Sequence, residues 1–196
     1  MSQTTIFSLI LQRFPNVHLM KKIAITLSMI ALSAISAHAQ IVGDTEQPLP
    51  YKVENVELKD VRNEPAKLPF FGEKNIIFFY IDPDRHKQNE EFTYEMERRH
   101  TATGPNIEGF GVLNLKDTMI PNAIVRTMAR KRCEKNNAIV LADTDRILSR
   151  AWNLGDCNNM FVLIVVNKAG ELVYCKKGEL TQEEQDEFFE FIEAYR

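Results

Sequence analysis

The fold of this chain is decided by the stretch Asn75-Ile76-Ile77-Phe78-Phe79-Tyr80-Ile81-Asp82-Pro83-Asp84-Arg85-His86-Lys87. Six consecutive apolar or aromatic residues (76–81) are too few for a buried helix and too uniform for a half-exposed strand, so they predict a strand covered on both faces. The polar residues 82–84 then end that strand. In open α/β sheets the loop at the carboxyl end of a central strand is the usual place for chemistry, so residues 82–87 are the first candidate site.

The segments around this strand predict an alternation of strands and helices. We expect one or two edge strands in 51–61, a turn between Pro65 and Pro69, and further strands at 107–115, 138–142, 160–166 and 171–176. We expect helices at 88–99 and 122–136, a short helix or irregular segment at 147–154, and a last helix after Thr181-Gln182-Glu183-Glu184, a capping box. This order predicts an α/β, thioredoxin-like fold: a mixed central sheet, right-handed crossovers that place helices on both faces, and a C-terminal β-hairpin plus helix.

Helical spacing predicts which residues of two of these helices face the core. In the segment 122–136 the shared face carries Val125, Met128, Ala129, Arg132 and Cys133. In the last helix the apolar stripe consists of Phe188, Phe191, Ile192 and Tyr195. Cys133 is therefore interpreted as a packing residue.

The N-terminal region has the pattern of a secretory signal peptide. Met20-Lys21-Lys22 is a charged start, 23–35 is apolar, and Ala37-His38-Ala39 is a cleavage site. We predict cleavage after Ala39, a periplasmic location, and one thioredoxin-like domain at 40–196. The apolar part is shorter than the roughly 20 residues of a membrane span, and no later segment qualifies. Residues 1–19 lie upstream, so either translation starts at Met20 or the charged region is unusually long.

The charge balance of the expected mature chain is acidic. All 27 acidic residues follow Ala39, whereas Arg13, Lys21 and Lys22 precede it, so cleavage leaves a net charge near −6. Nucleic-acid-binding domains carry basic surfaces instead. We therefore expect no nucleic-acid partner.

The usual redox positions of a thioredoxin-like fold carry no cysteine in this chain. A C-x-x-C motif would open the first helix, where the helix N-terminus lowers the thiol pKa, but 84–87 is Asp-Arg-His-Lys. A peroxidatic cysteine is missing from the same loop. The position before the hairpin, normally a cis-proline, is Asn158-Asn159-Met160. We therefore expect neither dithiol nor peroxidase chemistry, and no cofactor.

Cys157 is the one weak catalytic candidate among three cysteines. It lies in the loop 155–159, where a single thiol could act as a nucleophile or redox sensor, although its neighbour Asp156 would raise the thiol pKa. Cys175 is expected to be a packing residue on a covered strand. A hairpin with Val166 opposite Glu171 would place Cys175 near position 162, roughly 16 Å from Cys157, so no disulfide is predicted.

Several motifs in the second half resemble the YtfJ family of exported bacterial proteins. Gly178-Glu179-Leu180-Thr181-Gln182-Glu183-Glu184 is similar to the family's G-x-L-T-Q-E-E, and 167–173 is similar to its D-K-D-G-R-V hairpin. Ala151-Trp152-Asn153-Leu154 resembles A-W-x-L. Asn114, Asp117 and Ile120-Pro121 resemble N-x-x-D-x-I-P, with one extra residue here. The resemblance covers about 107–196 and implies a periplasmic thioredoxin-like protein of a family without an established reaction.

These observations favour a non-catalytic binding or accessory module of the periplasm. Its partner would be a periplasmic protein or a small ligand, bound at a rim formed by 82–87, 116–118 and 155–159. The candidate binding residues are Asp82, Asp84, Arg85, His86, Asp117, Asp156, Asn158 and Asn159. Asp82, Asp84 and His86 also offer metal-ligand types, but their spacing fits no named motif, so we interpret them as a solvated, helix-capping turn and expect no metal. The alternative function is a single-thiol oxidoreductase that uses Cys157.

Overall fold

The computed structural model describes residues 43–196, so the predicted signal peptide, its cleavage site and the extension 1–19 lie outside the described residues. The strands are β1 (Tyr51–Lys52), β2 (Glu57–Asp60), β3 (Pro65–Lys67), β4 (Asn75–Ile81), β5 (Ile107–Asn114), β6 (Val140–Asp143), β7 (Phe161–Val166) and β8 (Glu171–Lys177). The helices are η1 (Pro83–Arg85), α3 (Glu90–Arg98), α4 (Asn122–Asn136), α5 (Ile147–Ala151), α6 (Gln182–Ile192) and η2 (Glu193–Tyr195). None of these described helices combines the length and the apolar character needed to cross a membrane.

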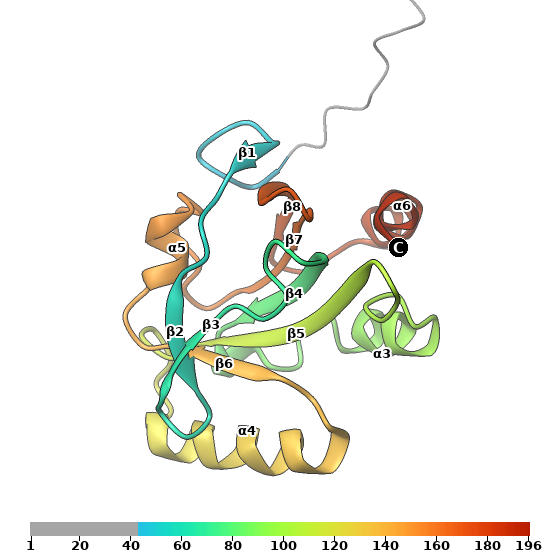
Figure 1. Cartoon of the computed structure of the whole chain (residues 1–196). Helices are drawn as coiled ribbons and strands as arrows, with labels where there is room; N and C mark the ends of the chain where they lie inside the picture. Colours follow the sequence, from blue (N-terminus) through green and yellow to red (C-terminus); the bar gives the residue numbers. More distant parts are fainter. Residues whose placement is uncertain (1–42) are drawn as a thin grey trace, which may run out of the picture. The chain divides into compact units, whose positions relative to one another are not determined.

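The strands form one mixed sheet in the order β1-β8-β7-β4-β5-β6-β2-β3 (Figure 1). β4 lies inside it, parallel to β5 and antiparallel to β7. Its side chains alternate between the two faces, and Ile77, Phe78 and Tyr80 are all at most 1% exposed. The prediction of a central strand covered on both faces is confirmed.

Helices cover both faces of the sheet, as predicted. On one face Phe92 of α3 meets Phe188 and Phe189 of α6, with ring centroids 5.6 and 5.5 Å apart, in a cluster that includes Ile77. On the other face Trp152, which directly follows α5, packs against Phe78 at 5.9 Å. The hydrophobic core therefore has two layers, one on each face of the sheet.

The crossover helices do not supply both layers, contrary to expectation. The chain moves from β4 to β5 to β6 in one direction, and right-handed crossovers then place α3 and α4 on the same face. Val125 of α4 accordingly packs with Leu113 and Ala142, whose side chains point to the same face as Ile77. The opposite face is covered by α5, which links β6 to β7, the antiparallel neighbour of β4.

Two strands form in the region 51–61, where one or two edge strands were predicted. β1 pairs with β8 at one edge, whereas β2 pairs with β6 at the other edge and is followed there by β3. Residues 65–67, expected in a turn, form β3. Proline is tolerated there because an edge strand leaves one row of backbone groups without ladder partners.

Helix α4 is far more exposed than its predicted apolar face implied. Of that face only Val125 is buried; Met128 is 65% exposed and Cys133 is half-buried. The interpretation of Cys133 as a core residue is therefore wrong in part. The cluster beneath the helix consists of Val125, Leu115 and Ala142 with few neighbours, and so small a cluster cannot cover several helical turns.

The C-terminal hairpin and helix form as predicted, with a shifted register. Val166 lies opposite Leu172, one residue from the expected pairing, and a β-bulge near Val165 and Val166 adds a second residue, so that Cys175 lies opposite Ile164 instead of position 162. All three cysteines are unbridged. Thr181 caps α6 in a complete capping box with Glu184. Phe188 and Ile192 are buried, while the other stripe residues, Phe191 and Tyr195, are partly exposed.

Candidate functional site

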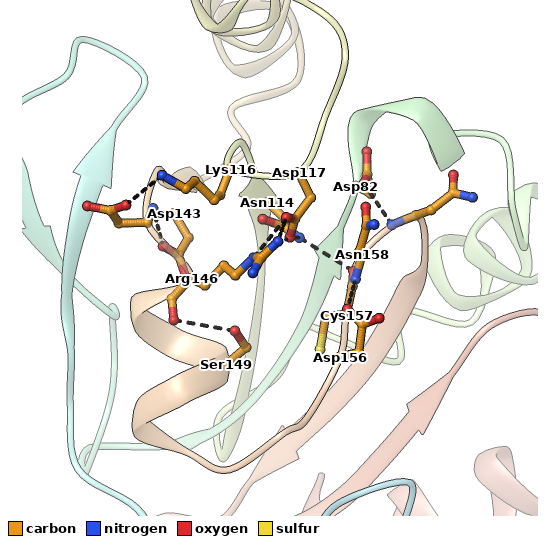
Figure 2. Close-up of polar contacts among 12 residues, drawn as sticks. Asp82, Asn114, Lys116, Asp117, Asp143, Arg146, Ser149, Asp156, Cys157 and Asn158 are labelled. Carbon is orange, nitrogen blue, oxygen red and sulfur yellow. Dashed lines mark hydrogen bonds and ion pairs between the residues drawn. The ribbon is translucent and has the colours of Figure 1, made fainter.

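A buried polar side chain stands at the carboxyl end of each of the three parallel strands. Asp82 directly follows β4, Asn114 ends β5 and Asp143 ends β6, and each is at most 1% exposed. Parallel neighbours bring these ends to one edge of the sheet. Figure 2 shows these three residues with the loops that meet above them.

Asp82 joins the first and last loops of the predicted rim. One carboxylate oxygen accepts the backbone N–H of Asp84 at 3.0 Å and caps η1, and the other accepts the N–H of Asn159 at 2.8 Å. The predicted capping role is confirmed. The predicted solvation is wrong for Asp82, because the loop 155–159 folds over it and replaces water with a backbone donor.

The other predicted residues of the 82–87 loop make exposed contacts. Asp84 accepts the N–H of Met119 at 2.9 Å, and Arg85 Nε donates to Asn159 Oδ1 at 2.7 Å. His86 Nδ1 lies 3.0 Å from the carbonyl oxygen of Pro83. Asp84, Arg85 and His86 line a shallow hollow of about 340 Å³ together with 87–89 and Glu179.

Asp117 is held by two partners on different elements. Its carboxylate accepts from Asn114 Nδ2 at 2.7 Å and from the Arg146 guanidinium, whose Nε lies 2.8 Å from Oδ1 (Figure 2). The hydrogen bonds from Arg146 lower the pKa of Asp117 despite burial, and the same bonds raise the pKa of Arg146. Asn114 Oδ1 is buried with no hydrogen-bond partner among the described residues.

Asp143 fixes the start of α5. Its carboxylate accepts the N–H groups of Asp145, Ile147 and Leu148 at 3.1, 2.9 and 2.9 Å, and the Tyr80 hydroxyl at 3.3 Å. Burial, followed by the Asp143 charge, strongly raises the pKa of Tyr80, so the phenol stays a donor. Arg146 lies in the left-handed region (φ 56°), an uncommon conformation for arginine that the surrounding bonds hold in place.

A cleft of about 570 Å³ opens between α5 and the loops at this edge. It contains the predicted residues Asp117, Asp156 and Asn158, whereas the 82–87 loop faces the separate hollow. The predicted rim thus consists of two hollows joined through the Asp82 and Arg85 contacts to Asn159. The lining of the cleft is Glu46, Asp117, Arg146, Ser149, Arg150, Asn153, Gly155, Asp156, Cys157 and Asn158.

Cys157 forms part of the cleft wall but presents little of its side chain. The residue is 4% exposed and belongs to the same buried cluster as Cys175. Burial is the main cause that raises the pKa of the Cys157 thiol to about 11; Asp156 raises it further, as predicted, while Lys177 partly opposes the shift. Burial likewise raises the pKa of Cys175 to about 12. A neutral thiol is a poor nucleophile.

Sequence reasoning missed several residues of this site, among them Asp143, Arg146 and Arg150. Asp143 directly follows the strand predicted at 138–142, and that position was the available signal for a buried cap. Nothing in the local sequence predicts that Arg146 reaches Asp117, 29 positions away. Within 43–196 no group of three His, Cys, Asp or Glu side chains is arranged to hold a metal ion.

Comparisons with known proteins identify the fold alone. No family model and no curated protein matches this chain. Among solved structures it is similar to the exposed lipoprotein thioredoxin of Streptococcus pneumoniae (15% identity, TM-score 0.51, 72% of this chain and 99% of that one). It is also similar to BsSco, of the Sco family of cytochrome c oxidase assembly proteins (10%, 0.53, 76% and 95%), and to a peroxiredoxin-like protein of Aquifex aeolicus (11%, 0.52, 77% and 89%). These likenesses confirm the thioredoxin-like fold.

Proposed function

We propose that this chain is an exported, periplasmic member of the YtfJ family that acts as a non-catalytic binding or accessory module. The location rests on the signal-peptide pattern that ends at Ala39, and the family on the motifs in 107–196. The proposed non-catalytic role rests on the loops at the edge of the sheet where a thioredoxin-like fold usually carries its redox cysteines. These two loops are tied to each other through Asp82 and Asn159 instead of presenting a thiol.

The cleft beside α5 is the proposed contact surface. Its lining combines three carboxylates (Glu46, Asp117, Asp156) with two guanidinium groups (Arg146, Arg150) and the amides of Asn153 and Asn158. Groups of both signs and neutral amides suit a polar ligand or a polar segment of a partner protein, because each can match a donor or an acceptor. The second hollow, beside Arg85 and His86, extends this surface.

A photo-crosslinking amino acid tests this surface in the producing cells. Placed at Asn158, it is expected to give a discrete adduct, either a partner protein or a small mass increment. Placed at Lys168, an exposed residue of the β7–β8 turn, it serves as the control and is expected to give none. The same adducts from both positions, or none from Asn158, would remove the cleft from the proposal.

The alternative, a single-thiol oxidoreductase, is opposed by the burial of Cys157. With a pKa of about 11, about one thiol in ten thousand is ionised at pH 7. We expect Cys157 and Cys175 to react with iodoacetamide only after denaturation, as read by intact mass. The half-buried Cys133 is expected to react first, and Cys133→Ser assigns that label. Fast labelling of Cys157 in the native protein, or a mixed disulfide on it, would favour the oxidoreductase.

A further inference from the structure

Helix α4 concentrates positive charge in an otherwise acidic chain. It carries Arg126, Arg130, Lys131, Arg132 and Lys135 against the single acid Glu134, a net charge of +4, whereas the whole chain has 24 basic and 27 acidic residues. The other helices of comparable length differ in sign: α6 contains only acidic charges. The charge of α4 is therefore a local feature and not a consequence of composition.

These five cations have no ionic partner within the described residues. Every ion pair found between residues 43 and 196 uses a lysine or arginine outside α4. Arg126 donates only to the neutral amide oxygen of Asn63, at 2.9 Å. Surface cations of a stable domain commonly pair with nearby carboxylates, and here the helix presents a field of one sign to solvent.

The same helix exposes apolar side chains among the cations. Ile124 and Met128 are 51% and 65% exposed, and Met119, just before the helix, is 93% exposed. Ile124, Met128, Lys131 and Lys135 follow the spacing i, i+4, i+7, i+11 and so share one helical face, distinct from the face that buries Val125. Apolar side chains flanked by long cationic ones are typical of helices that lie at a lipid interface.

The shape of this region favours a flat counter-surface. Neither of the two described hollows includes a residue of α4, and Figure 1 shows the helix as an outer layer below the sheet. A helix on the outside of the fold can lie along a planar surface. The acidic residues outside α4 repel an anionic surface only weakly, because charges beyond the Debye length of about 8 Å are screened at physiological salt.

We propose that the face of α4 formed by Ile124, Met128, Lys131 and Lys135 docks reversibly on anionic lipid. The cations lie at the level of the phosphate headgroups, and the isoleucine and methionine side chains enter the boundary with the acyl chains. The surface is separate from the cleft, so one molecule could contact a lipid leaflet and a ligand or partner at the same time.

The test is flotation of the purified protein with vesicles of phosphatidylcholine alone or with 30% phosphatidylglycerol, a fraction chosen as about that of an anionic membrane. We expect association with the anionic vesicles only, and its loss in about 0.5 M salt. Lys131→Glu should weaken it by at least about fivefold, whereas Lys168→Glu, the same charge change on an exposed residue elsewhere, should not. Both side chains are exposed, so both variants should fold, which a thermal melt checks.

Four outcomes would contradict the proposal. Equal binding to both vesicle types would assign the association to a segment other than α4. Equal losses of binding for the two lysine variants would show that binding depends on the net charge of the protein and not on the position of the lysine. No binding to anionic vesicles would leave α4 as a surface for an acidic protein and not for lipid. Met128→Gln should also weaken association, by about twofold or more, and an unchanged value would contradict insertion of that side chain.

Discussion

Replacement of Asp143 by alanine is expected to lower the free energy of unfolding by about 3–5 kcal/mol. The carboxylate is fully buried and accepts four hydrogen bonds, from three backbone N–H groups at the start of α5 and from Tyr80. Removing it leaves all four donors without this acceptor, those of Leu148 and Tyr80 in buried positions, and it also removes the cap at the start of α5. Urea unfolding followed by tryptophan fluorescence measures the change.

Two variants serve as controls for Asp143→Ala. Asp145→Ala changes an exposed carboxylate of the same turn, which pairs only with Lys116, and should cost less than about 1 kcal/mol. Tyr80→Phe removes one of the four donors and should cost an intermediate amount. A loss for Asp143→Ala no larger than that for Asp145→Ala would show that the buried carboxylate does not organise α5.

For Asp82→Ala we expect a loss of about 2–3 kcal/mol, the second largest effect. The side chain is 1% exposed and accepts the N–H group of Asp84, in the same turn, and that of Asn159, 77 positions away in the chain. Without the carboxylate, two backbone donors lose their acceptor and the loop 155–159 loses its side-chain tie to the end of β4. Besides a lower urea midpoint, the variant should expose Cys157 to alkylation in the native state.

The matched control for Asp82→Ala is Asp84→Ala. Asp84 stands two positions later and is exposed, and its single partner outside the turn is the N–H of Met119. This control should change stability by less than about 1 kcal/mol and leave Cys157 protected. If Asp82→Ala also leaves Cys157 protected, the loop is held closed by other contacts, and the tie through Asn159 is not its main support.

Several parts of this protein depend only on short segments and could be predicted from them. The uniform run 76–81 can be satisfied only by burial on both faces, so the central strand was predictable. The capping box at Thr181 and Glu184 and the hairpin turn at 167–170 satisfy their own backbone groups locally, so they were predictable too. The absence of C-x-x-C and the capping role of Asp82 could likewise be read from neighbouring residues.

Contacts between distant groups, and the burial of side chains that these contacts cause, became known only from the three-dimensional structure. The β-bulge at Val165 moved the hairpin register, and the exposure of Met128 followed from the small area of sheet under α4. The pair of Asp117 with Arg146 and the closure of 155–159 over Asp82 join segments far apart in the chain. The desolvation that raises the pKa of Cys157 depends on those same loops. Such contacts follow from the relative placement of whole elements, which local residue patterns do not encode.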